Sequence, residues 1–76
     1  MEVEILKFLY NHSEGNYRST QLLFIDFLEA HKEFMDKQTL ILNAIQNCIT
    51  KGFIKSKNRE NPNSLIYITE EGIKQL

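Results

Sequence analysis

The sequence has little of what small proteins use to supplement a hydrophobic core. It holds a single cysteine, Cys48, so no internal disulfide can form, and this usage fits a reducing cytoplasm. One proline and three glycines exclude collagen-like and low-complexity chains. No apolar run approaches the roughly 18 residues of a membrane span, and the start of the chain carries Glu2 and Glu4 where a signal peptide would be basic. We therefore expect a cytoplasmic protein held together by packing alone.

The residues that are present have the balance of an ordinary globular protein. The chain has 76 residues, of which 42% are hydrophobic and 25% charged. This length predicts one domain, residues 1–76. A chain this short buries only about 60–65% of its extended surface, so its stability margin is thin. Association into a homodimer would widen that margin.

Charge is distributed unevenly along the chain. The net charge of −1 argues against a protein that coats nucleic acid through bulk charge. Residues 1–37, however, hold seven acids and four bases, whereas residues 38–60 hold one acid and four bases. Those bases are Lys51, Lys55, Lys57 and Arg59. The basic stretch is either a binding segment or simply a solvated hairpin.

Helical periodicity dominates the first two thirds of the chain. Apolar residues spaced i, i+3, i+4 and i+7 predict a helix over 2–10, followed by turn formers over 11–16. A second helix is expected from near 21 to about 31, with Ser19 or Thr20 as its N-cap. A third helix is expected to follow Asp36 as N-cap and to end at Gly52.

Beyond Gly52 the pattern changes to that of strands. Residues 53–57 are short and half polar, residues 65–69 are β-branched and aromatic, and the two flank a cluster of turn formers over 58–64. They predict an antiparallel hairpin with a long loop. Thr69 is expected to cap a short last helix over 71–76.

The expected core combines the three helices and one face of the hairpin. A two-stranded hairpin is unstable alone, so Phe53, Leu65, Tyr67 or their neighbours should cover the edge of the bundle. The predicted helical core residues are Leu6, Leu9, Leu23, Phe27, Ile41, Ile45 and Cys48.

Two short segments resemble those of a known fold. Lys51-Gly52-Phe53-Ile54 is similar to the step from recognition helix to wing in bacterial winged-helix regulators, and Tyr67-Ile68-Thr69-Glu70-Glu71-Gly72 is similar to the exit from the wing in MarR-like and PadR-like regulators. The chain lacks the extra dimerisation helices of those regulators. The resemblance implies an α+β fold of the small winged-helix type. Such a fold has a three-helix bundle, a two-stranded antiparallel β-hairpin as wing and a short C-terminal helix.

The third helix has an outer face rich in amides. Projected at 100° per residue, Ile41, Ile45, Cys48 and Ile49 share one side. The other side carries Thr39, Leu40, Asn43, Asn47 and Thr50, with Gln46 at its edge. Amides match the adenine edge in the major groove, although they are equally common as solvated surface. The winged-helix resemblance implies Gln38, Thr39 and Asn43 as base-reading candidates, with Asn47 on the same face.

The resemblance also implies contacts to the DNA backbone. The wing would lie along the minor groove or a phosphate strand. Its candidate residues are Lys55, Lys57, Asn58 and Arg59. Arg18 and Ser19, at the start of the second helix, stand where a helix N-terminus can hold a phosphate, and Lys37 precedes the third helix. The alternative for Arg18 is a plain surface residue.

The second helix has more apolar residues than one core can bury. Phe24, Ile25 and Leu28 are candidates for a dimer or partner interface, unless the first helix and the hairpin cover them. A homodimer would double the few phosphate contacts that one chain offers.

Catalysis is not expected. His12, His31 and Cys48 lack metal-ligand spacing, and no Gly-rich phosphate loop is present, so we expect neither metal nor cofactor. The sequence thus predicts a DNA-binding domain of a bacterial or mobile-element transcriptional regulator that binds duplex DNA. The alternative is a winged-helix protein-interaction module that uses the apolar second helix.

Overall fold

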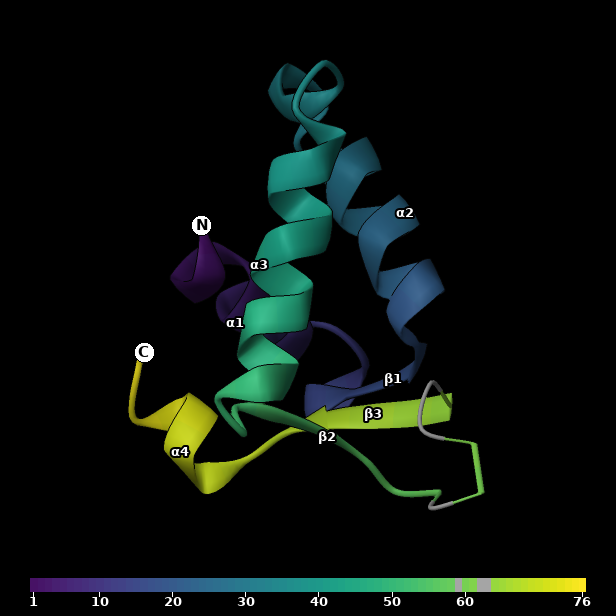
Figure 1. The fold of residues 1–76 in the computed structure, drawn as a ribbon, viewed down its shortest axis with the longest axis vertical. Helices are drawn as coiled ribbons and strands as arrows, with labels where there is room; N and C mark the ends of the chain where they lie inside the picture. The colour runs from purple at the N-terminus through teal and green to yellow at the C-terminus, as the bar shows by residue number, and fades with distance from the viewer. Residues whose placement is uncertain (59, 62–63) are drawn as a thin grey trace.

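Helices cover one face of a small antiparallel sheet (Figure 1). The computed structural model describes residues 1–58, 60–61 and 64–76. In Figure 1, α2 and α3 rise away from the sheet, and α4 lies beside the end of α3. The helices are α1 Glu2–Asn11, α2 Thr20–Ala30, α3 Gln38–Thr50 and α4 Glu70–Ile73, with 3-10 turns at Ser13–Gly15 and Lys32–Phe34. The strands are β1 Asn16–Ser19, β2 Ile54–Ser56 and β3 Ser64–Ile68.

The predicted ends of α1 and α2 are confirmed to within one residue, whereas the N-cap of α3 differs and the last helix, α4, spans Glu70–Ile73 instead of residues 71–76. The Ser19 hydroxyl caps α2 by accepting from the Leu22 amide at 3.1 Å. Gly52 ends α3 with φ of +78°, a conformation that favours glycine. Asp36 does not cap α3, because the Lys37 amide donates to Phe34 O at 2.8 Å and the N-cap position falls on Lys37.

The sheet has three strands instead of the expected two. Its order is β1-β3-β2, and both neighbours of β3 run antiparallel to it. β1 was not predicted, since its four residues Asn16–Ser19 lack an apolar alternation. Pairing with β3 and a hydrogen bond from the Tyr17 hydroxyl to the Asp26 carboxylate on α2 hold β1 in place.

All seven predicted core residues of the helices are buried. On the hairpin, Ile54, Ile66 and Ile68 are buried in the core, and the predicted Phe53 is half-buried and packs against it. Leu65, which was also predicted to cover the bundle, is instead 43% exposed. On α3, Ala44 is buried instead of Ile49, which is 37% exposed.

The two segments that resemble winged-helix motifs contact each other. The Thr69 hydroxyl donates to Gly52 O at 2.6 Å and accepts from the Gly72 amide at 3.2 Å, as predicted for the cap of the last helix. A Cβ on Gly72 would lie 2.6 Å from Phe53 O, so only glycine fits there. This junction fixes where the chain leaves α3 and where it leaves β3.

The described residues therefore form a compact α+β domain of four α-helices and a three-stranded antiparallel sheet. The α+β class is the one predicted. The prediction of a two-stranded sheet was wrong, because β1 adds a third strand. Within the described residues, no helix is long and apolar enough to cross a membrane.

Candidate nucleic-acid interface

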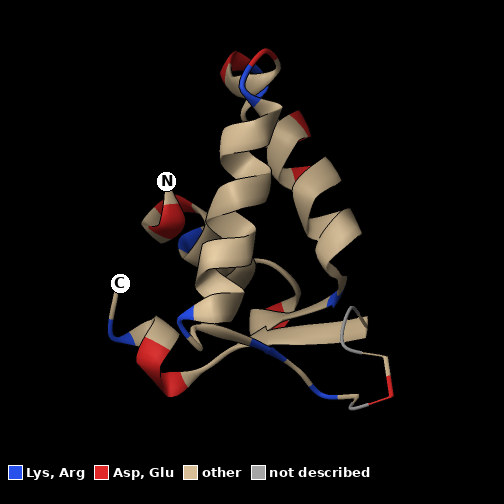
Figure 2. Cartoon of the chain, viewed as in Figure 1, with Lys and Arg blue, Asp and Glu red and all other residues tan. Residues whose placement is uncertain are grey.

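The outward face of α3 is polar but carries no charge. No Asp, Glu, Lys or Arg occurs between Gln38 and Thr50, and Figure 2 shows this helix without acidic or basic colour. Thr39, Asn43 and Gln46 are exposed as predicted, and Gln46 Nε2 donates to Thr50 Oγ1 at 3.4 Å. Within the described residues, the Asn43 amide has no hydrogen-bond partner, so it is available to a ligand.

Apolar side chains interrupt this polar face. Leu40, Leu42 and Ile49 are 52%, 51% and 37% exposed. Leucine side chains of this kind can contact a thymine methyl group. They also suit a protein partner, since the surface of a solvated helix is usually charged.

Asn47 lies on the side of α3 that faces α1. Next to it, Lys51 Nζ pairs with Glu2 Oε1 at 2.8 Å. Hydrogen bonding from Lys51, with a smaller contribution from Asn47, lowers the pKa of Glu2, and the same ion pair raises the pKa of Lys51. Asn47 is exposed one helical turn after Asn43, with its amide beside Glu2, and Lys51 is not an isolated cation.

The N-terminal end of α3 holds two more candidates. The Gln38 side chain donates to Met35 O at 3.0 Å, so its amide is partly used in closing the turn before α3. Lys37 is exposed at this end. Because α3 has 13 residues, it is about 20 Å long, and Lys37 is separated by that length from the sheet at the other end of the helix.

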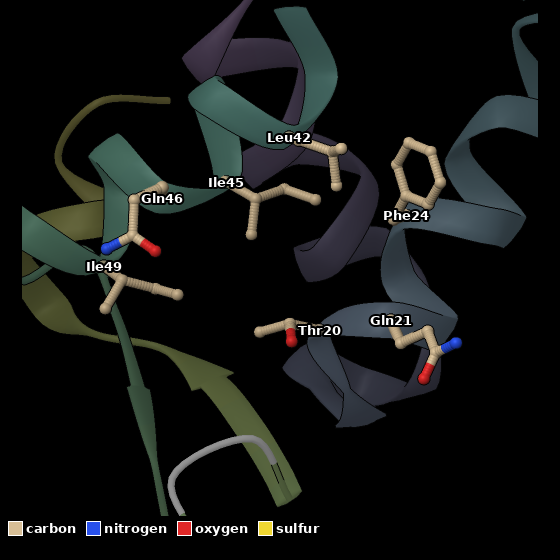
Figure 3. Close-up of a pocket in the computed structure, with 7 residues that line it drawn as sticks. All are labelled: Thr20, Gln21, Phe24, Leu42, Ile45, Gln46 and Ile49. Carbon is tan, nitrogen blue, oxygen red and sulfur yellow. The ribbon is translucent and has the colours of Figure 1, made fainter. Parts of the chain in front are cut away.

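A shallow groove of about 200 Å³ separates α2 from α3. Figure 3 shows Phe24 and Leu42 on opposite walls, with Thr20 and Ile49 farther along. Its lining residues are Thr20, Gln21, Phe24, Leu42, Ile45, Gln46 and Ile49. The groove thus joins the first turn of α2 to the outward edge of α3. Sequence reasoning missed it, because the relative rotation of two helices is not a sequence signal.

Arg18, Lys55 and Lys57 lie on one face of the sheet. Asn16 pairs with Tyr67 and Tyr17 with the buried Ile66, so the exposed Arg18 lies on the face turned away from the core. Lys55 pairs with Tyr67 on the same face. Lys57 extends the ladder through its amide bond to Leu65 O at 3.0 Å. The structure therefore brings together three cations that the sequence attributed to two separate elements.

None of these three cations is in an ion pair with a described residue. The ion pairs within 1–58, 60–61 and 64–76 join Met1 to Glu4, His31 to Glu33, Lys51 to Glu2 and Lys74 to Glu71. Figure 2 shows basic colour along β2 and its continuation and where β1 leads into α2. Arg18 is thus a strand residue, whereas Ser19 serves as the cap of α2.

The loop after β2 is organised by hydrogen bonds within it. Asn58 Oδ1 accepts from the amides of Glu60 and Asn61, at 3.0 and 3.3 Å. Ser56 Oγ donates to Ser64 O at 2.7 Å, a role that sequence reasoning missed. Asn58 therefore shapes the loop, and the predicted contact of Arg59 lies outside the described residues.

The predicted interface patch on α2 is only partly exposed. Leu28 is buried, which corrects its expected exposure, because it faces inward beside Phe27. Phe24 is half-buried in the groove, and Ile25 is 41% exposed. Ile25 alone is fully on the surface, so α2 by itself offers little apolar area.

The histidines and Cys48 pack against other side chains. The His12 ring stacks on Phe8 at 3.9 Å between centroids, and His31 lies 4.4 Å from Phe27. Burial raises the pKa of the Cys48 thiol to about 11. No group of three or more metal-ligating side chains occurs among the described residues.

No family model, curated protein or solved structure matches this chain.

Proposed function

We propose that this chain is a winged-helix DNA-binding domain that acts in transcriptional control in the cytoplasm of a bacterium or for a mobile element. The order α1-β1-α2-α3-β2-β3 with sheet order β1-β3-β2 supports the fold assignment. The contact between the segments around Gly52 and Thr69 supports it further, since both segments resemble winged-helix motifs.

The observation that carries the proposal is the exposed edge of α3. Thr39, Asn43 and Gln46 present hydrogen-bonding groups without charge, and Asn43 is the best placed to pair with an adenine. An α-helix fits the major groove, and Leu40 or Leu42 would contact thymine methyl groups. In this arrangement α3 reads base edges and leaves the backbone to other elements.

Backbone contacts come from the cations around α3. Lys37 lies at one end of the helix, and Arg18, Lys55 and Lys57 lie on the sheet at the other end. Each phosphate contact contributes about 0.9 to the salt slope of duplex binding, so four contacts give a slope of about −3.6. Because this is a small slope, one domain binds weakly, and a homodimer on two half-sites would double it.

Fluorescence anisotropy with labelled duplexes of mixed sequence tests the proposal. We expect binding at 50 mM salt that weakens by about 10²-fold at 200 mM, as the predicted slope requires. Failure of a folded sample to bind any duplex at 50 mM salt would contradict the proposal.

The matched pair Asn43→Ala and Asn11→Ala tests the role of α3. Both asparagines are exposed, and Asn11 ends α1. We expect Asn43→Ala to flatten the preference between duplex sequences and Asn11→Ala to leave it unchanged. An equal loss of affinity on every sequence would show that Asn43 does not read bases.

A protein-interaction module is the second candidate. The exposed Leu40, Leu42 and Ile49 on an uncharged helix favour it, and the groove with Phe24 extends this apolar surface. The apolar surface thus lies mainly on α3 and in the groove, more than on α2. Size-exclusion chromatography with light scattering, together with duplex anisotropy, distinguishes the two: a monomer without duplex affinity that forms a stable complex with a protein partner favours the module.

A further inference from the structure

The outer face of the sheet carries basic residues around an aromatic ring. We define the outer sheet face as Asn16, Arg18, Lys55, Lys57, Leu65 and Tyr67, the residues that alternate with the buried isoleucines. Three of these six residues are basic, and none of them is acidic. In a chain with net charge −1, this concentration favours an anionic ligand.

The cations flank a central aromatic ring. Tyr67 is on β3, the middle strand, while Arg18 is on β1 and Lys55 on β2 at the two edges. Since neighbouring strands are about 4.8 Å apart, the two edges are separated by about 10 Å. Lys57 Nζ lies 5.7 Å from the centroid of the Tyr67 ring, so this ring face is within reach of charged groups at the surface.

The position of Tyr67 between the cations suits a single strand of nucleic acid better than a duplex. In a duplex, the faces of the bases are stacked on one another and cannot stack on Tyr67. In a single strand, a base can stack on an aromatic ring while its phosphates reach cations at either side. Leu65, which is 43% exposed next to Tyr67, extends the apolar platform for a second base.

We propose that the outer sheet face binds single-stranded nucleic acid. A base stacks on Tyr67, displacing Lys57 toward a phosphate, while Arg18 and Lys55 hold phosphates along the two edges of the sheet. The recognised chemistry is a phosphate backbone with an accessible base face, which single-stranded DNA and RNA share. This proposal does not depend on duplex reading by α3.

Anisotropy with labelled dT12, U12 and a duplex of the same length, at 50 mM salt, tests it. We expect dT12 or U12 to bind, and the oligonucleotide that binds more tightly identifies the preferred backbone. Tyr67→Leu should weaken this binding by about 5- to 150-fold, the range for loss of one stacked base. Tyr67→Phe should retain it, because the ring is kept.

Two double variants with the same change in charge distinguish phosphate contacts at the outer sheet face from the effect of the protein's total charge. Lys55→Gln with Lys57→Gln should lower the salt slope for dT12 by about 1.4, from about 0.7 per contact. Lys7→Gln with Lys32→Gln, on α1 and the turn before α3, should leave that slope unchanged.

The outcomes distinguish this proposal from the proposed function. No binding of dT12 or U12 by the folded protein overturns it, as does equal binding by Tyr67→Leu and Tyr67→Phe. Duplex binding that requires Asn43 with no single-strand binding retains the proposed function and overturns this one. Single-strand binding that requires Tyr67 supports it even where no duplex binds.

Discussion

The outward face of α3 and the outer sheet face are two surfaces with different chemistry on one small core. The α3 face has amides, hydroxyls and leucines without charge, whereas the outer sheet face has three cations around Tyr67. Amides can distinguish bases, and cations hold phosphates without regard to sequence. The difference indicates that specificity and affinity for nucleic acid would come from separate elements of this domain.

Both surfaces are held in place by side chains of the same helix and strands that point into the core. Ile41, Ala44 and Ile45 on α3 and Ile54 and Ile66 on the strands meet in a single buried cluster. Because one core supports both faces, damage to it should remove both kinds of binding together. Substitutions on either face should affect only one kind.

The largest expected effect comes from the adjacent pair Ile66 and Leu65. Ile66→Ala removes a buried side chain and should lower the free energy of unfolding by about 2–5 kcal/mol. Leu65→Ala, on the outer sheet face, should lower it by less than about 1 kcal/mol. Thermal or urea denaturation measures both, and similar losses would show that the strand register is different.

Gly72→Ala is expected to have the next largest effect. Its added Cβ would lie 2.6 Å from Phe53 O and 2.7 Å from Ile68 Cγ1, so the junction between α4 and the hairpin must shift. We expect a loss of about 1–3 kcal/mol in the free energy of unfolding. Ile73→Ala, next to it but 42% exposed, is the control in the same denaturation experiment, and a Gly72→Ala variant as stable as wild type would contradict the close contact.

The third prediction is that the two surfaces affect different properties of duplex binding, namely sequence discrimination and salt dependence. Asn43→Ala should remove about 1–3 kcal/mol of discrimination between sequences at constant salt slope. Lys55→Gln with Lys57→Gln should lower the slope by about 1.8 while the order of preferred sequences is unchanged. Anisotropy titrations at several salt concentrations measure both quantities. A shifted sequence preference in the lysine variant would show that the outer sheet face also takes part in sequence discrimination.

The smallest expected effect concerns the ion pair between Glu2 and Lys51. The pKa of Glu2 is lowered by this pair, so its stabilising contribution is present above pH 4.5 and is lost as the pH falls through the folded-state pKa. The pKa of Lys51 is raised, so its contribution is lost only as the pH rises through a value above 10.5. Melting curves of Glu2→Gln and wild type should therefore converge only once the pH has fallen through the lowered folded-state pKa of Glu2, and a constant difference would contradict the pair.

Local signals in the chain determined the helices, their main caps and the seven core residues on them. Helical spacing is set by 3.6 residues per turn, and Ser19, Gly52 and Thr69 act on backbone groups within a few residues. These features could be predicted because their physical causes are local. The exposed amides of α3 followed from the same periodicity.

Tertiary structure alone decided which residues share a surface. β1 exists because β3 supplies its hydrogen-bonding partners, and this pairing places Arg18 on the face of Lys55 and Lys57. The packing of the helices brought Lys51 beside Glu2, buried Leu28 and left the groove beside Phe24 between α2 and α3. Such outcomes depend on contacts between residues far apart in the chain, and no local pattern of side chains encodes them.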